Sequence, residues 1–319
     1  MSWWRTGACI AAMLWVAATG AAGAAVPAQD DEVPLLSLWA SEPDATPGRI
    51  TERSLDPRVP DRIIEDVRAP YIAVHAPARP SGVALLVTPG GGYARIVLDK
   101  EGTALLPAFV EAAGITLFVL RYRLPDASHA EGADAPLVDA QRAMRTIRAH
   151  AKDYGIDPGR IGVMGFSAGG HVAARLATAR DAAYMPRDAI DAYAWRPDFA
   201  LLIYPVISLE PDIAHTGSRT RLLSAAGDAG IATRERLSPA LHVGAHTPPL
   251  FLLHAQDDDV VPVGNTLAIH AAALAAGAPA SLHIFPTGGH GFGVRDAHGP
   301  LARWPRLAID WIDALDTSP

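Results

Sequence analysis

Residues 161–170 read IGVMGFSAGG, and this stretch decides the fold. The apolar run 161–164 is typical of a short buried strand, and a helical pattern follows the glycines. Between them, Gly165-Phe166-Ser167-Ala168-Gly169 has the form G-x-S-x-G. In this strand–turn–helix context the sequence predicts a nucleophile elbow, a strained turn that exposes a serine hydroxyl. A phosphate loop would instead carry G-K-[ST] or G-x-G-x-x-G, and neither is present here.

Short apolar runs alternate with helical patterns on both sides of this elbow. The expected strands are 83–87, 116–120, 161–164, 199–204, 250–254 and 281–285. The expected helices are 136–154, 168–178, 266–276 and 303–315, with Gly155 and Gly277 at the ends of the first and third. Near-continuous apolar strands that alternate with helices predict an α/β fold, with a mostly parallel central sheet covered by helices on both faces.

The N-terminal part of the chain has a different composition. Residues 1–25 combine one early positive charge, a short apolar core and an A-x-A-like site, which predicts a cleaved signal peptide rather than a spanning helix. Residues 26–60 are rich in Pro, Asp and Glu and are expected to form an irregular arm. Residues 61–319 are expected to form one catalytic domain, without internal repeats.

Charge and cysteine content exclude several classes of protein. The net charge of −7 argues against nucleic-acid binding, and the sequence has no Lys/Arg cluster for anionic lipid. The only cysteine, Cys9, lies in the predicted signal peptide, so the mature chain is expected to have no disulfide. We expect a periplasmic or secreted protein that has no membrane attachment after signal cleavage.

A serine hydroxyl needs a base and an acid partner, and two loops can supply them. His290 lies in a glycine-rich loop, 287–293, after the last expected strand, where a mobile imidazole could reach Ser167. The acid is expected after strand 250–254, where Asp257, Asp258 and Asp259 follow one another. Position along the chain does not choose among these three, and a solvated turn or a calcium loop is the alternative for this segment.

An oxyanion hole needs backbone N–H groups aimed at the developing negative charge. The residue after the nucleophile, Ala168, is expected to supply one of them. The loop after strand 83–87, which reads TPGGGY over 88–93, is expected to supply the other, because successive glycines let the backbone approach a substrate closely. His171, one turn after Ser167, is expected to be a packed helix residue.

At this point the chain resembles the carbohydrate acetylesterases of the α/β-hydrolase superfamily, the acetylxylan-esterase-like branch. The shared motifs are Leu38-Trp39, PGGGY over 89–93, KEG over 100–102, RYRLP over 121–125, GFSAGGH over 165–171, TGSR over 216–219, HAQDD over 254–258 with VP over 261–262, and GHGF over 289–292. The resemblance implies a Ser167–His290–Asp258 triad, because the family's aspartate precedes two residues and then Val-Pro. It also implies oxyanion amides from Gly91 and Gly92, beside Ala168. Asp259 stands where the family commonly has proline.

The resemblance further implies removal of acetyl groups from acetylated plant polysaccharides such as xylan or xyloglucan, with an acetylated carbohydrate as the binding partner and no cofactor. A serine peptidase or a general short-chain carboxylesterase of the same fold is the alternative, and the triad alone does not separate them. An endoxylanase would need a pair of carboxylates flanking the glycosidic bond, which the motifs do not offer. No metal site is expected, since no histidine–carboxylate set has zinc spacing. The sequence does not indicate the oligomeric state.

Overall fold

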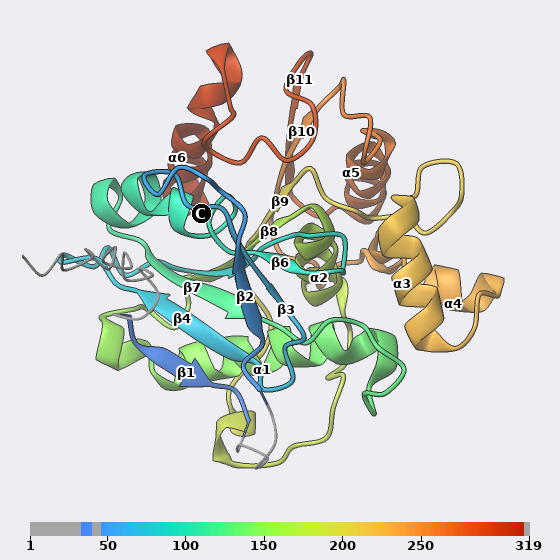
Figure 1. Ribbon diagram of the computed structural model, residues 1–319, viewed down its shortest axis with the longest axis horizontal. Helices are drawn as coiled ribbons and strands as arrows, with labels where there is room; N and C mark the ends of the chain where they lie inside the picture. Colours follow the sequence, from blue (N-terminus) through green and yellow to red (C-terminus); the bar gives the residue numbers. More distant parts are fainter. Residues whose placement is uncertain (1–32, 40–45, 316–319) are drawn as a thin grey trace, which may run out of the picture.

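A twisted central sheet organises the molecule (Figure 1). The computed structural model describes residues 33–39 and 46–315. In these residues eight strands follow the order β1-β4-β7-β5-β8-β9-β10-β11. The six strands from β7 to β11 in this order are parallel and are joined by five pairings, whereas β4 and β1 are antiparallel additions at one edge. The strands are β1 (Leu35–Ser37), β4 (Tyr71–His75), β7 (Thr116–Arg121), β5 (Ala84–Thr88), β8 (Ile161–Phe166), β9 (Ala200–Ile203), β10 (Leu250–Ala255) and β11 (Ala280–Phe285).

Alternation along the strands builds a separate apolar core on each face of the sheet. In β5, Ala84 and Leu86 belong to one buried cluster, whereas Leu85 and Val87 belong to the other. Because successive side chains of a strand point to opposite faces, a strand buried on both faces must be apolar throughout. This explains the continuous apolar runs in the sequence and confirms the predicted α/β architecture.

Helices cover both faces. The α-helices are α1 (Ala135–Ala149), α2 (Ser167–Thr178), α3 (Thr216–Ala226), α4 (Ile231–Arg236), α5 (Gly264–Ala276) and α6 (Trp304–Leu315). Shorter helical segments are η2 (Thr103–Leu105), η3 (Pro107–Ala112), η4 (Gly132–Asp134), η5 (Ala151–Tyr154), η6 (Ala189–Ala192), η7 (Pro239–His242) and η8 (Gly299–Arg303). Residues of α1, α2 and α5 join one core cluster, and residues of η3 and α6 join the other.

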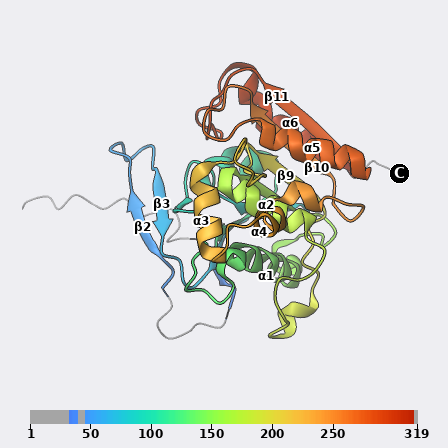
Figure 2. The same cartoon turned by 90° about the vertical axis from the view of Figure 1, so that its right-hand side faces the viewer.

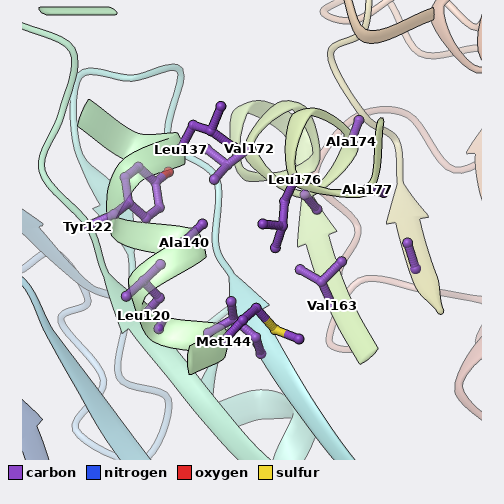
Figure 3. Packing of buried hydrophobic residues seen from close by; sticks show 14 of the residues in the cluster. Leu120, Tyr122, Leu137, Ala140, Met144, Val163, Val172, Ala174, Leu176 and Ala177 are labelled. Atoms are coloured by element: carbon purple, nitrogen blue, oxygen red, sulfur yellow. The ribbon is translucent and has the colours of Figure 1, made fainter. Parts of the chain in front are cut away.

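The interface between α1, α2 and the sheet shows how this core is filled (Figure 3). Leu137, Ala140 and Met144 of α1 face Val172 and Leu176 of α2, all of them buried. The small residues of α2 let this helix lie close to the sheet. The helix begins at Ser167, directly after the last residue of β8. The elbow is therefore held between two fully packed elements.

The predicted helix ends are confirmed where a glycine was expected to stop them. Gly155 follows η5 with φ 64°, and Gly277 follows α5 with φ 69°. Both are left-handed conformations that residues with a Cβ adopt at a cost, so these positions end the helices. The expected helix over 136–154 is split in the structure, because α1 ends at Ala149 and a separate 3-10 turn, η5, follows.

The expectation of an irregular arm over 26–60 is wrong in two stretches. β1 pairs antiparallel with β4 at the edge of the main sheet, and β2 (Arg49–Glu52) pairs with β3 (Arg62–Glu65). With β6 (Ile96–Val97), β2 and β3 form a second, three-stranded sheet. Figure 2 shows the β2–β3 hairpin at the margin of the molecule. These strands have two to five residues, too few to show a period in the sequence.

The predicted signal peptide, residues 1–25, lies outside the described residues, and export therefore stays a prediction. Within the described ranges no helix has the length and apolar character needed to cross a bilayer.

Candidate active site

The nucleophile elbow lies where β8 ends and α2 begins. Ser167 has φ 51°, a strained left-handed conformation for a residue with a side chain. A Cβ on Gly165 would lie 2.6 Å from the Cβ of Ala173, and one on Gly169 would overlap the carbonyl groups of Thr88 and Pro89. The close crossing of β5, β8 and α2 thus explains both outer glycines of the motif. Ser167 opens α2, so the positive end of the helix dipole lies beside its hydroxyl.

Ser167, His290 and Asp258 form a continuous series of hydrogen bonds. The Oγ of Ser167 lies 2.9 Å from Nε2 of His290, and Nδ1 of His290 lies 2.7 Å from Oδ2 of Asp258. Because an ionised carboxylate only accepts, Nδ1 carries the proton and Nε2 of the neutral ring is free to accept from the serine. The structure therefore brings together the three residues predicted from the sequence, in the geometry of a nucleophile, its base and an orienting acid.

Asp258 is held as an anion by several donors. It is buried, and besides His290 it accepts the N–H groups of Val260 and Val261 and lies 3.1 Å from Nε2 of His254. Burial alone would raise its pKa, but the hydrogen bonds from His254 and His290, together with the backbone, hold the pKa of Asp258 well below its usual value. An ionised Asp258 can stabilise the imidazolium that forms when His290 takes up a proton.

The two neighbouring aspartates have other surroundings. Asp257 is exposed and accepts the N–H of Gly289 at 2.8 Å, so it fixes the loop that carries His290. Asp259 is exposed. The choice among three adjacent carboxylates, which chain position left open, thus follows from burial and from contact with His290.

The predicted oxyanion loop lies directly against the nucleophile. A Cβ on Gly90 would lie 2.9 Å from the Cβ of Ser167. Its own N–H is already bound to Glu101, whereas in the described part of the chain the N–H groups of Gly91 and Gly92 have no acceptor. Ala168 lies in the first turn of α2, where backbone N–H groups have no partner within the helix. Gly91, Gly92 and Ala168 remain the predicted donors for an oxyanion.

Sequence reasoning gave no role to Glu101, which the structure places beside the triad. Its Oε2 accepts the N–H of Gly90 at 2.6 Å, and its Oε1 accepts the hydroxyl of Tyr204 at 3.0 Å. Burial raises the pKa of Glu101, while the Gly90 N–H and the nearby charge of His290 act in the opposite direction. Tyr204 also accepts the N–H of Gly293, and its ring lies 5.1 Å from that of His290. The residues around it, Asp99-Lys100-Glu101-Gly102, carry no spacing pattern that indicates this role.

His171 is a packed helix residue, as expected. It is fully buried, its Nδ1 accepts the hydroxyl of Tyr93 at 2.8 Å, and its Nε2 donates to the carbonyl of Leu237 at 2.7 Å. Across the described residues no group of three or more His, Cys, Asp and Glu side chains is placed to hold a metal ion.

A mostly parallel sheet flanked by helices, with a nucleophile elbow after one strand and an acid and a histidine after two others, defines an α/β hydrolase. More particularly, the chain belongs to the BD-FAE family, whose model matches residues 78–272. This confirms the resemblance to an esterase family of this superfamily.

Three similar proteins have names related to xylan. An acetylxylan esterase of Xylanibacter ruminicola is 35% identical over 219 residues, which is 68% of this chain and 42% of that protein. An endo-1,4-beta-xylanase B of Butyrivibrio fibrisolvens is 35% identical over 213 residues, 66% of this chain and 32% of that protein. A crystal structure of an acetyl ester-xyloside bifunctional hydrolase from Caldicellulosiruptor lactoaceticus matches with a TM-score of 0.70 and 35% identity, over 89% of this chain and 96% of the other. The chain spans less than half the length of the two curated relatives.

Proposed function

We propose that this protein is a serine esterase that removes acetyl groups from acetylated xylan-type carbohydrates through an acetyl-enzyme. The observation that carries the proposal is the hydrogen-bonded series Ser167–His290–Asp258 in a chain that belongs to the BD-FAE family. The names of the relatives support the acetyl group and the xylan-type alcohol.

In the proposed reaction each of these residues has one role. His290 takes the proton of Ser167 as its Oγ attacks the ester carbonyl, and Asp258 stabilises the imidazolium. The amides of Gly91, Gly92 and Ala168 are the donors expected for the tetrahedral oxyanion. His290 then returns the proton to the departing sugar oxygen, which leaves an acetyl group on Ser167. Water activated by His290 releases acetate and regenerates the serine.

Acetate release from defined fragments tests this proposal. We expect release from acetylated xylan and xyloglucan oligosaccharides, and a fall of kcat/KM from acetate to butyrate to octanoate p-nitrophenyl esters. Ser167→Ala should lower kcat by about 10³-fold or more. Ser224→Ala, an exposed serine on α3, is the matched control.

Other outcomes would indicate other members of the same fold. A preference for octanoate would indicate a general carboxylesterase, and cleavage of peptide amides would indicate a peptidase. Release of reducing xylose ends that persists in Ser167→Ala would require a second chemistry elsewhere, since a glycosidase works through paired carboxylates. Any of these results without acetate release from the oligosaccharides would overturn the proposal.

A further inference from the structure

Resting on the proposed function, we propose that His215 binds the alcohol part of the substrate. Its Nε2–H donates a hydrogen bond to a sugar hydroxyl on the carbon next to the one that carries the acetyl ester. His215 would thereby select acetyl esters of vicinal diols over esters of simple alcohols.

The tautomer of His215 follows from its contacts at the start of α3. The backbone N–H of Ser218 donates to Nδ1 of His215 at 3.2 Å, and the Ser218 hydroxyl lies 2.8 Å from the same nitrogen. A ring nitrogen that accepts a backbone N–H carries no proton, so in the neutral ring the proton is on Nε2. The cap also fixes the ring, because His215 is the N-cap residue of α3.

The free side of this ring lies next to the oxyanion loop. A Cβ on Gly92 would lie 3.3 Å from Cε1 of His215, so the ring contacts the loop that is expected to hold the ester carbonyl. Among the described residues Nε2 of His215 has no hydrogen-bond partner, and the side chain is half-buried. A donor that is oriented by the protein and left without an acceptor beside a reaction centre is suited to a polar group of the substrate.

Electrostatics keep His215 a neutral donor. Burial, followed by the positive charges of His290 and Arg221, lowers the pKa of His215, while Asp258 acts in the opposite direction. These influences also indicate that the ring lies within electrostatic reach of the triad. A neutral N–H suits an uncharged hydroxyl and does not compete for the proton that His290 must carry.

A neighbour of His215, Arg221, lines a cavity. Arg221 and His215 both lie close to Gly217, and Arg221 forms no ion pair with any described residue. The cavity lined by Arg221 has a volume of about 460 Å³. This volume falls in the range of small-molecule sites. Three segments form its wall. They are the turn after β3, with Asp66 and Arg68, the end of the oxyanion loop, with Tyr93 and Ala94, and the segment after β7, with Asp126. Polar walls of this kind fit carbohydrate hydroxyls.

The test compares two substrates that form the same acetyl-enzyme. kcat/KM is measured for methyl 2-O-acetyl-xylopyranoside and for p-nitrophenyl acetate, with wild type, His215→Ala and His215→Asn. Asparagine is a favourable N-cap residue, so His215→Asn retains the cap of α3 while it removes the imidazole donor. We expect the ratio of the two kcat/KM values to fall by about 3- to 10-fold in both variants, the factor for one neutral hydrogen bond. A lower melting temperature is expected for His215→Ala only.

A 3-deoxy analogue of the sugar ester completes the design as a mutant cycle. For wild type, kcat/KM should be lower on this analogue than on the parent sugar ester by the same factor. For the His215 variants, kcat/KM should be the same on both sugar esters, because donor and acceptor form one interaction. An equal loss on both acetate esters would place His215 in the common chemistry and overturn the inference. If His215→Asn kept the wild-type ratio of the two kcat/KM values, His215 would only cap α3, and the inference would be wrong. Wild type that cleaves p-nitrophenyl acetate but no sugar ester would instead refute the proposed function itself, and the inference with it.

Discussion

Among single residues, the three consecutive aspartates after β10 have different surroundings. We expect Asp258→Asn to lower kcat on p-nitrophenyl acetate by about 10⁴-fold, because an amide N–H facing Nδ1 forces His290 into the wrong tautomer. Asp257→Asn should be much milder, since its amide oxygen can still accept the N–H of Gly289. Asp259→Asn, at an exposed position, is the matched control.

Steady-state kinetics of the three variants, with circular dichroism to confirm folding, decide this point. A severe effect of Asp257→Asn together with a mild effect of Asp258→Asn would refute the assigned acid.

Glu101 gives a second expectation at this scale. Glutamine at position 101 must direct its NH₂ group either at the N–H of Gly90 or at the hydroxyl of Tyr204, and both of these groups donate to Glu101. A buried donor left without an acceptor costs about 1–3 kcal/mol. We therefore expect Glu101→Gln to loosen the oxyanion loop and to lower kcat by roughly 10-fold or more.

Glu111→Gln, at an exposed position of η3, is the control for that experiment. Wild-type kcat for Glu101→Gln would mean that the Gly90 contact does not hold the loop in its active geometry.

At the scale of elements, α2 crosses so closely over the end of β5 that alanine is expected to be less stable than glycine at one position of the helix. Alanine normally stabilises a helix relative to glycine by about 1 kcal/mol. At position 169, however, the added Cβ would overlap the carbonyl groups of Thr88 and Pro89. We expect Gly169→Ala to lower the free energy of unfolding by about 3 kcal/mol or more. Urea denaturation measures it, with Gly159→Ala, where the Cβ meets only an ordinary contact, as the control.

If Gly169→Ala were as stable as wild type, α2 could shift away from β5, and the tight packing behind the elbow would not be required for the fold.

The elements that the sequence predicted correctly are those with a strong pattern of their own. The strands β5, β7, β8, β9 and β10 are mostly apolar because both faces of the sheet are covered there, and β11 at the edge is mostly apolar as well. The expected bounds of these six strands differ from the structure by at most two residues. The short antiparallel strands β1 to β4 and β6 were missed. Their pairing depends on partners distant in sequence rather than on any local period.

At the scale of the whole molecule, the buried His171 couples stability to pH. Burial, reinforced by the charge of Arg175, lowers the pKa of His171 to about 3. In the unfolded chain a histidine takes up a proton near pH ~6.5, whereas the folded protein resists this until about pH 3. The free energy of unfolding should therefore fall as pH drops below about 6.5, with a contribution from His171 of up to ~1.4 kcal/mol per pH unit.

Denaturation between about pH 7 and about pH 5.5 tests this, because Asp258, whose pKa is lowered from that of an ordinary carboxyl, affects stability only below about pH 4. The slope should decrease in His171→Gln but persist in part, since burial also lowers the pKa of His129, His215 and His283. An unchanged slope would contradict a neutral His171 in the folded state.

The triad residues of the candidate site could be predicted because the fold determines where the loops that carry them lie. Parallel strands bring the loops that follow them to one edge, so Ser167, His290 and the acidic loop had to meet there. Glu101, Tyr204 and His215 were not predicted as site residues. Their contacts run between irregular segments whose paths are set by packing, and a single acidic, aromatic or histidine side chain in such a segment carries no pattern.

The pairing of the last two strands has a consequence for thermal inactivation of the protein. Asp258 follows β10 and His290 follows β11, which pair residue for residue, and β11 is the outermost strand with every side chain only half-buried. Asp258 and His290 are therefore held together by the β10–β11 pairing at the edge of the sheet, while Ser167 follows β8 near the centre of the sheet. Fraying of that edge would separate His290 from its partners while the interior stays folded. Inactivation would then be a local and reversible event that precedes global melting, and the lifetime of the catalyst would be set by its most peripheral strand.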